Sequence, residues 1–331
     1  MVSGTDKENF LLSIAIPTWN RSQNLQEALT YLLPQINCCK GQIEIIISDN
    51  GSTDNTQSIV TKFIGLYPDL NIISNKNKEN LGFYGNFRKC REIASGKYFW
   101  VLSDDDYVGP GLIHVILKKI SESNDLAVIY LKLDKLQQSF HIYNLERDSL
   151  LIQEGYTIGL ISSVIFLNSK EFDEAIYQKY TNSAFIAFIF LLNAFNYYKN
   201  VLVIKGHCLM AANAKPKGYN FFDIFINHME HVIEYMHFIK LPGKIIIKFR
   251  CAYLINFIRQ YYIIYKGEKI LKFGKFEPSE ISSIKEIEFW IHRSYSDLKC
   301  YWLQFYLLTL VPAYFFTLGL KIRRLILKKQ N

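Results

Sequence analysis

Short apolar runs alternate with amphipathic stretches along the first hundred residues. The runs are bounded by polar or turn residues, which is typical of buried strands, and between them apolar residues recur at helical spacing. The predicted strands lie at residues 11–17, 42–49, 70–74 and 98–102, and the predicted helices lie at 24–33, around 59–64 and at 86–94. This alternation predicts a parallel α/β sheet with helices on its faces.

Polar clusters follow three of these predicted strands. They are Thr18 to Arg21, Asp49 to Asp54, and Asp104 to Asp106. The carboxyl ends of parallel strands meet at one edge of a sheet, where α/β proteins bind their ligands. We therefore expect the three clusters to form one site.

The third cluster consists of three consecutive carboxylates after a wholly apolar strand. Adjacent like charges raise the energy of the ionised state, and burial adds a desolvation cost that a bound cation offsets. A divalent metal with hard oxygen ligands fits this description. A solvated acidic loop or a helix N-terminus is the alternative that this stretch alone leaves open.

The middle of the chain is less regular. Residues 126–133, 161–167 and 200–205 are predicted strands. Residues 180–198 carry no formal charge and are long enough to span a bilayer marginally, yet Asn and Ser interrupt them and α/β sequence flanks them. We favour a buried or interface-facing helix there over a membrane-spanning one.

The sequence changes character at Lys240–Gly243, where a Pro-Gly pair predicts a boundary. Further on, residues 300–320 are uncharged and rich in aromatic side chains, and residues 321–331 contain Lys and Arg but no acid. Aromatic residues beside cations are typical of membrane-interface or membrane-spanning helices. Pro312 favours in-plane or re-entrant binding over a full span, and a C-terminal core helix is the alternative.

Composition narrows the class of protein. A chain of 331 residues that is 50% hydrophobic can bury a large core, and its net charge of +8 indicates an anionic partner. The cations gather beside the aromatic run and form no groove-reading motif, so we expect no nucleic acid partner. The six cysteines lack zinc-finger spacing and the first ten residues precede no signal-peptide core, so we expect free thiols and a cytoplasmic protein.

Several segments, in this order and with these gaps, carry a family resemblance. They are Ser13–Arg21, Glu44–Asp54, Asn80–Gly82 with Asn86, and Ala94–Tyr98 leading into Leu102–Asp106. Together they resemble the nucleotide-sugar-binding half of a GT-A fold glycosyltransferase of family 2, of the bacterial surface-polysaccharide type. The resemblance implies a Rossmann-like, mostly parallel α/β domain over residues 10–240. Within it, residues 10–110 would bind the nucleotide sugar and 111–240 the acceptor, and residues 241–331 would form a helical, membrane-associating extension.

The resemblance also implies which residues bind the nucleotide sugar. They are Pro17, Thr18, Trp19, Arg21, Asp49, Asn86 and Asp104. By analogy, Thr18 and Trp19 pack against the nucleobase, and Asp49 accepts a hydrogen bond from uracil while also capping the turn that follows it. Asn86, at a predicted helix start, lies where the family contacts the nucleotide, and an ordinary helix cap is its alternative role.

The acid cluster departs from the family's usual Asp-Ser-Asp-Asp pattern, because Ser103 replaces the first acid. On this register the resemblance implies that Asp104 faces the ribose. Asp105 and Asp106 would hold a divalent metal, Mn2+ or Mg2+, which bridges the donor phosphates and stabilises the departing nucleoside diphosphate. The division of labour between these two acids stays open.

Inversion by in-line attack of an acceptor hydroxyl, as the resemblance implies, requires a general base. Family members often place an acid at the start of the helix after the acceptor-side strand. That helix is predicted here to begin at Thr181–Ser183, which lacks a carboxylate. Among the nearest acids, Glu171, Asp173 and Glu174, we choose Asp173 as the base candidate, and a solvated loop acid is the alternative for each.

The sequence therefore predicts an inverting, metal-dependent glycosyltransferase. Its donor would be a nucleoside-diphosphate sugar, with UDP favoured, and its acceptor a growing surface glycan such as capsule or lipopolysaccharide, lipid-linked glycans included. We expect it to lie peripherally on the inner face of the cell membrane, bound through its C-terminus. The alternative is a non-catalytic member that binds nucleotide sugars as a membrane-docked partner.

Overall fold

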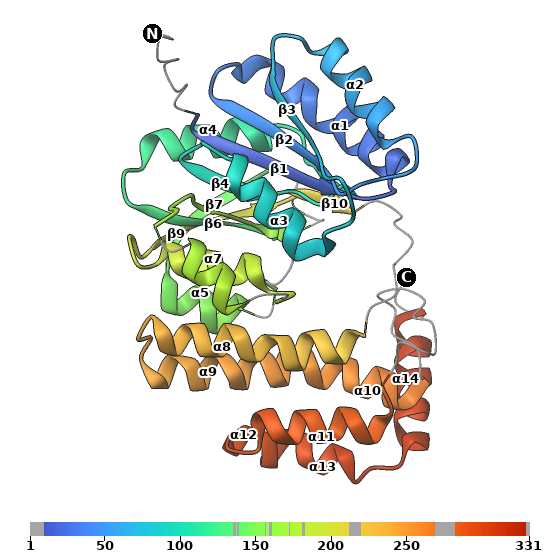
Figure 1. Ribbon diagram of the computed structural model, residues 1–331. Helices are drawn as coiled ribbons and strands as arrows, with labels where there is room; N and C mark the ends of the chain where they lie inside the picture. Colours follow the sequence, from blue (N-terminus) through green and yellow to red (C-terminus); the bar gives the residue numbers. More distant parts are fainter. Residues whose placement is uncertain are drawn as a thin grey trace. The chain divides into compact units, whose positions relative to one another are not determined.

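The computed structural model describes residues 10–328 except 135–136, 138, 156, 159–160, 172, 181–182, 212–219 and 269–281. Contacts divide the chain into two units (Figure 1). Unit 1 contains Met1–Arg147 and Thr157–Ala214, and unit 2 contains Asp148–Tyr156 and Lys215–Asn331. The division therefore falls earlier than the boundary predicted at Lys240–Gly243, which is a turn between two helices of unit 2.

Unit 1 is built on an eight-stranded sheet of order β3-β2-β1-β4-β8-β6-β9-β7. Its strands are β1 (Leu12–Thr18), β2 (Ile43–Asp49), β3 (Asn71–Lys76), β4 (Tyr98–Val101), β6 (Leu126–Leu133), β7 (His141–Glu146), β8 (Val164–Leu167) and β9 (Asn200–Gly206). Strands β1 to β4 are parallel, β8 is antiparallel to both its neighbours, β6 and β9 are parallel, and β7 is antiparallel to β9. A short antiparallel pair, β5 (Asp106–Val108) and β10 (Leu209–Ala211), lies outside this sheet. The predicted fold class, a mostly parallel sheet flanked by helices, is confirmed.

Helices cover both faces of this sheet (Figure 1). They are α1 (Ser22–Ile36), α2 (Thr56–Leu66), α3 (Gly82–Ile93), α4 (Leu112–Glu122), α6 (Asp173–Lys179) and α7 (Ile186–Ala194), with short turns η1 (Asn37–Cys39) and η2 (Ile161–Ser163). Alternate residues of a strand point to opposite faces. Accordingly Trp100 joins the core beneath α1 and α4, whereas the ring of Phe99 lies 6.0 Å from that of Phe87 on α3 and 5.7 Å from that of Phe166 on β8.

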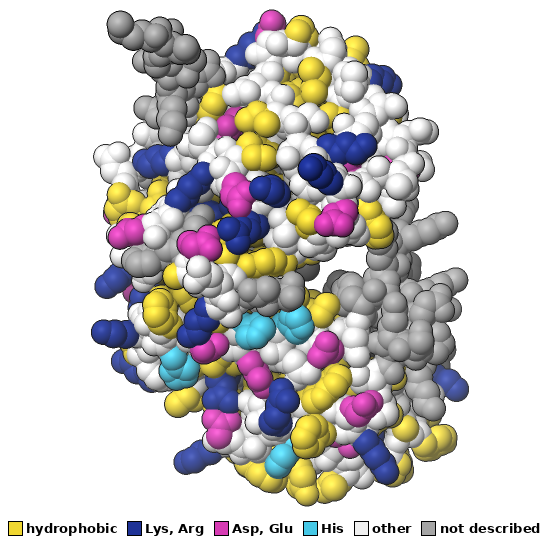
Figure 2. Space-filling view, in the orientation of Figure 1, with side chains coloured by type: hydrophobic (Ala, Val, Ile, Leu, Met, Phe, Trp, Pro, Cys, Tyr) yellow, Lys and Arg dark blue, Asp and Glu magenta, His cyan; other side chains and the backbone are white. Residues whose placement is uncertain are grey.

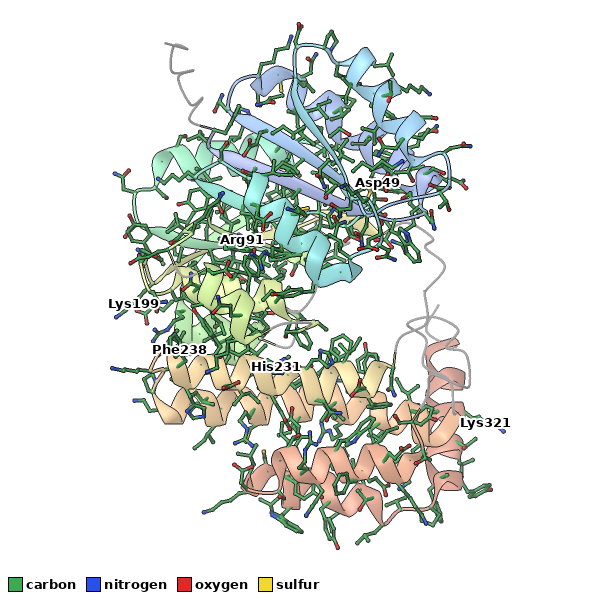
Figure 3. The ribbon with its side chains drawn as sticks, viewed as in Figure 1. Asp49, Arg91, Lys199, His231, Phe238 and Lys321 are labelled. Carbon is green, nitrogen blue, oxygen red and sulfur yellow. The ribbon has the colours of Figure 1, made fainter. Side chains whose placement is uncertain are left out.

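The uncharged stretch 180–198 contains α7, and all nine residues of this helix are buried. The prediction of a buried helix is therefore confirmed. The helix begins at Ile186, later than the predicted start at residue 181. Its Phe190 lies under the guanidinium of Arg91, which is buried in α3 with a centroid distance of 4.3 Å (Figure 3). Cation–π contact of this kind lets an arginine pack inside an aromatic core.

A buried carboxylate stabilises the edge of the sheet at which β1, β2 and β4 begin. Glu44 on β2 accepts hydrogen bonds from the Ser13 hydroxyl at 2.5 Å, the Ser95 amide at 2.5 Å and the Gly96 amide at 3.0 Å. A Cβ on Gly96 would lie 2.6 Å from the backbone nitrogen of Ser13, so only glycine fits there. Part of the segment Ala94–Tyr98, which carries the family resemblance, thus has a structural role away from the strand ends that bear the polar clusters.

Unit 2 is helical throughout its described part. Its elements are α5 (Arg147–Glu154, of which Arg147 lies in unit 1), η3 (Asp223–His228), α8 (Met229–Phe238), α9 (Gly243–Tyr253), η4 (Leu254–Ile258), α10 (Arg259–Glu268), α11 (Ile284–Tyr295), α12 (Lys299–Tyr301), η6 (Trp302–Tyr306), α13 (Leu307–Thr309) and α14 (Ala313–Lys328). Within the described residues, no single helix has the length and apolar character of a membrane span. One pair, Lys299–Thr309 with Ala313–Lys321, meets the test jointly and is bent by 91°. We call it the bent pair.

Candidate nucleotide-sugar site

The carboxyl ends of β1, β2 and β4 bring the three polar clusters to one edge of the sheet. Thr18 and Asp49 are register partners at the ends of β1 and β2. The Thr18 hydroxyl also donates to Oδ2 of Asp104 at 2.7 Å, across 86 residues of sequence. The first and third clusters are therefore in direct contact, as strand polarity predicts.

Arg21 links two of the acids through a single nitrogen. Its Nη1 donates to Oδ1 of Asp104 at 2.6 Å and to Oδ2 of Asp105 at 3.0 Å. The Ser103 hydroxyl donates to the other oxygen of Asp105. With Thr18 on Asp104, every oxygen of these two carboxylates has a hydrogen-bond donor. A residue of the β1–α1 loop thus offsets part of the negative charge of the cluster.

Burial and charge shift the pKa values of these groups in opposite directions. Burial raises the pKa of Asp104, and the nearby Arg21 guanidinium and Thr18 hydroxyl offset this effect only in part. For Arg21, burial acts to lower the pKa, but the charges and hydrogen bonds of Asp104 and Asp105 outweigh it and raise the pKa. Arg21 therefore stays cationic in this setting.

Asp106, the third acid, begins β5 and pairs in register with Ala211 of β10. Burial raises the pKa of Asp106 to about 6, the charges of Asp105 and Asp104 add to this, and a hydrogen bond from Ser162 opposes it. Ser162 also accepts from the Ser103 amide at 2.9 Å. No sequence pattern indicates Ser162, which lies about sixty residues away in a 3-10 turn and not in the predicted strand 161–167.

The acid cluster suits a metal that the donor helps to bind. Among the described residues, no three His, Cys, Asp or Glu side chains converge into a protein-only metal cage. Mg2+ in phosphate sites usually takes one or two carboxylates and completes its shell with substrate oxygens and water. Asp105 and Asp106 are half-buried hard-oxygen donors at such a position, so the residues fit this mode of binding. The metal itself stays a prediction.

Asp49 lies fully buried at the end of β2 (Figure 3). Its Oδ1 accepts from the Ser52 amide at 2.8 Å and its Oδ2 from the Gln57 side chain at 2.6 Å. The turn-capping role is therefore present in the structure, and Gln57 is a partner that sequence reasoning missed. A hydrogen bond from uracil to Asp49 stays a prediction. It requires the β2–α2 loop to open, or Gln57 to share Oδ2 of Asp49 with the base.

The β1–α1 loop that carries the predicted base-packing residues is tied to the β2–α2 loop. Asn20 adopts a positive φ of 50°, a conformation that asparagine tolerates better than most residues. Its amide donates to the Ser52 hydroxyl at 2.8 Å, and its side chain accepts from the Thr53 amide at 2.8 Å. Next to it, Trp19 is 38% exposed, and Pro17 pairs in register with Ser48 inside the sheet. Packing of a base on Trp19 stays a prediction.

Asn86 belongs to a buried polar network under the same edge. Helix α3 begins at Gly82, so Asn86 lies in its second turn and not at the predicted helix start. Its side chain accepts from the Ser48 hydroxyl at 2.6 Å and from Asn77 at 3.0 Å, and donates to the Ser48 carbonyl at 2.9 Å. The alternative role as a helix cap is therefore wrong. Asn86 joins α3 to the end of β2, and its contact with a nucleotide stays a prediction.

The structure describes the side chains of two of the three base candidates. Asp173 begins α6, and its side chain lies outside the described residues. Glu171 accepts from the Tyr197 hydroxyl at 2.6 Å, and Glu174 pairs with Arg88 at 3.1 Å. These two acids thus have structural partners, and the choice of Asp173 stays a prediction.

Solved structures share this architecture. S. aureus TarS 1–349 in complex with UDP-GlcNAc aligns with a TM-score of 0.61 over 86% of this chain and 82% of that chain, at 16% identity. A similarity at this identity establishes the fold, which is GT-A. The sequence model of Glycosyl transferase family 2 matches residues 13–198, more than half of the chain. The protein belongs to glycosyl transferase family 2.

Curated relatives match the same part of the sequence. Abequosyltransferase RfbV of Salmonella typhimurium is 33% identical over 116 residues, which cover 35% of this chain and 34% of the relative. The GalNAc(5)-diNAcBac-PP-undecaprenol beta-1,3-glucosyltransferase of Campylobacter jejuni is 27% identical over 176 residues, which cover 50% of this chain and 56% of the relative. The chain thus spans less than two thirds of these relatives.

Proposed function

We propose that the protein transfers a sugar from a nucleoside-diphosphate sugar, with UDP favoured, during synthesis of a surface polysaccharide. One observation carries the proposal: Thr18 at the end of β1 and Arg21 in the β1–α1 loop contact the acid cluster at the carboxyl ends of the strands. The names of the relatives support it, since RfbV is an abequosyltransferase and TarS has been solved with UDP-GlcNAc.

The acids would contact different parts of the bound donor. Asp104, held by Thr18 and Arg21, would face the ribose. Asp105 and Asp106 would hold a divalent metal, Mn2+ or Mg2+, which supplies Lewis-acid stabilisation of the charge on the leaving nucleoside diphosphate. Half-burial of both acids lowers the local dielectric, which strengthens their interaction with a cation.

Transfer would invert the anomeric centre. An acceptor hydroxyl attacks the anomeric carbon in line as the nucleoside diphosphate departs, and a carboxylate takes the hydroxyl proton. Asp173 is the proposed base. The alternative, a member that binds nucleotide sugars without turnover, follows if no acid serves in this role.

The bent pair supports an acceptor held at a membrane. Many large apolar side chains of the pair and of the break between its helices are exposed: Trp302, Leu303, Tyr306, Leu307, Leu310, Tyr314, Phe315 and Leu318. We call them the apolar surface, and Figure 2 shows hydrophobic side chains together at the lower end of the molecule, over the region of α11 and α13 in Figure 1. The sequence has no acid after Asp297 and ends in cations.

Apolar and aromatic side chains next to cations favour the anionic membrane interface. We therefore propose that the apolar surface lies in the plane of the inner leaflet. A lipid-linked glycan would then be an accessible acceptor, and the Campylobacter jejuni relative is named for an undecaprenol-linked one.

A donor screen tests the catalytic proposal. Nucleoside diphosphate release is measured across UDP-, CDP-, GDP- and TDP-sugars with Mn2+ or Mg2+, with and without a panel of glycan acceptors. We expect release to be fastest with a UDP-sugar. Binding of UDP in the presence of Mn2+ without turnover on any donor and acceptor would favour the non-catalytic alternative.

Vesicle flotation tests the membrane proposal. Replacing Leu303 and Phe315, which are 73% and 59% exposed, by Gln is expected to abolish binding to vesicles that contain phosphatidylglycerol. The matched control is Phe238→Gln, because Phe238 is 60% exposed on α8 and lies outside the apolar surface (Figure 3). A wild-type protein that stays unbound at low salt would contradict the proposal, and self-association through this surface would appear instead as a concentration-dependent dimer.

A further inference from the structure

Arg21 occupies the position beside Asp105 that a bound metal ion would need. Its Nη1 lies 3.0 Å from Oδ2 of Asp105 and 2.6 Å from Oδ1 of Asp104. The other oxygen of Asp104 accepts from the Thr18 hydroxyl, and the other oxygen of Asp105 accepts from the Ser103 hydroxyl. An incoming cation at Asp105 therefore meets either a hydroxyl or the guanidinium.

Arg21 is placed so that it can exchange partners. It precedes the first turn of α1 in a loop, and its side chain keeps 22% of its surface exposed, whereas that of Asp104 keeps 4%. A guanidinium and a divalent metal repel each other, so both cannot share the same oxygen of Asp105 without a large cost. A guanidinium also pairs well with phosphate, since its planar donors match two phosphate oxygens.

We propose that Arg21 is an exchangeable internal counter-ion of the acid cluster. Before the donor binds, it offsets part of the charge of Asp104 and Asp105 and holds them in place. When the diphosphate and its metal arrive, Arg21 releases Asp105 and pairs with the diphosphate. This inference rests on the proposed function, and it assigns Arg21 a positioning role that couples the two binding events.

The proposal predicts opposite effects of one substitution on two affinities. In Arg21→Gln, Mn2+ alone no longer competes with a guanidinium, so its affinity rises on the order of tenfold. The same variant lacks the phosphate partner, so the affinity for UDP at saturating Mn2+ falls on the order of tenfold. A residue that only stabilised the loop would lower both affinities. Arg21→Lys keeps the positive charge and should lie closer to wild type for Mn2+ alone.

Titration calorimetry of the full chain with Mn2+ alone, UDP alone, and UDP at saturating Mn2+ measures these affinities. The matched control is Arg88→Gln, which removes an exposed arginine of the same unit that pairs with Glu92 and Glu174, away from the acid cluster. It changes the net charge equally and should leave all three affinities within about twofold of wild type.

An Arg21→Gln variant whose affinity for Mn2+ is unchanged or weaker overturns the inference, while wild-type binding of UDP with Mn2+ leaves the proposed function standing. Wild-type protein that binds no UDP with Mn2+ overturns both. If Arg21→Gln does not fold, calorimetry of the wild-type protein tests the inference. Mn2+ and UDP are then expected to enhance each other's binding, and independent binding overturns the inference.

Discussion

At the residue scale, the three acids of the cluster are not equivalent. Asp104 is buried and bonded to Thr18 and Arg21, whereas Asp105 and Asp106 are half-buried. In the described part of the chain, Arg21 forms ion pairs with Asp104 and Asp105 but not with Asp106. Its ionised form is therefore opposed by burial and by two neighbouring negative charges.

The pH dependence of stability should reveal this cost. Asp106 has a folded-state pKa of about 6 against an ordinary value of 3.8, so the folded state binds more protons between these limits and stability falls as pH rises through them. Asp106→Asn removes the ionised group and should raise the free energy of unfolding near pH 7 by about 1–3 kcal/mol. The gain should shrink toward about pH 4, where wild-type Asp106 is protonated when folded.

Urea unfolding of wild type and Asp106→Asn across this pH range, without added metal, measures the effect. A variant that is less stable than wild type near neutral pH would contradict the description of Asp106 as a half-buried acid whose ionisation opposes folding.

Sequence reasoning identified the residues with distinctive chemistry and missed their neutral partners. Strand polarity placed Thr18 beside Asp104, because the ends of parallel strands meet regardless of sequence separation. Gln57 and Ser162 carry no charge and follow no motif, so their contacts with Asp49 and the acid cluster became visible only in three dimensions. The link between Arg21 and two acids also depends on loop geometry that a linear pattern does not encode.

At the element scale, the turn before β4 depends on one glycine. A Cβ at Gly96 would approach the Ser13 backbone nitrogen to 2.6 Å and separate Glu44 from its donors. Gly96→Ala should therefore lower the free energy of unfolding by about 2–4 kcal/mol. The control is Gly65→Ala in α2, where a Cβ meets open space and helix propensity should raise stability by up to about 1 kcal/mol.

Equilibrium urea unfolding of both variants provides the comparison. If Gly96→Ala were as stable as wild type, the buried Glu44 network could not be what fixes the start of the sheet.

A buried lysine contacts the bend in the C-terminal helices, and we expect it to stabilise the bend. Lys266 of α10 donates to the carbonyl oxygens of Leu308 at 3.2 Å and Thr309 at 2.7 Å, which lie at the end of α13. It also pairs with Glu288 at 3.2 Å. Lys266→Met would leave these carbonyls without their donor and Glu288 without its cation, so it should lower stability by about 2–4 kcal/mol and increase amide exchange around residues 307–317.

Hydrogen exchange followed by mass spectrometry localises this effect, with the exposed Lys285→Met on α11 as control. Unchanged exchange at the bend in Lys266→Met would show that Pro312 and local helix geometry fix the bend on their own.

At the scale of the whole molecule, the pattern of apolar residues predicted strands β1 to β4 and the helices α1 to α3 between them, but not α4 or β7. The absence of charge over residues 180–198 predicted the buried helix α7. The extent of unit 2 was not predicted, because the Pro-Gly break at Lys240–Gly243 looks like a boundary in sequence. In the structure this break is a tight turn, and α8 and α9 on its two sides belong to the same unit. A local break identifies a turn, whereas a domain boundary is defined by long-range contacts.

The acid cluster is the proposed place where metal and diphosphate meet. Calorimetry of UDP with and without Mn2+ on wild type and Asp105→Asn tests this most directly, with Asp69→Asn, an exposed acid of the same unit, as control. We expect Mn2+ to tighten UDP binding by wild type and Asp69→Asn on the order of tenfold or more, and to have no effect on Asp105→Asn. Equal enhancement by Mn2+ in Asp105→Asn and wild type would contradict the account.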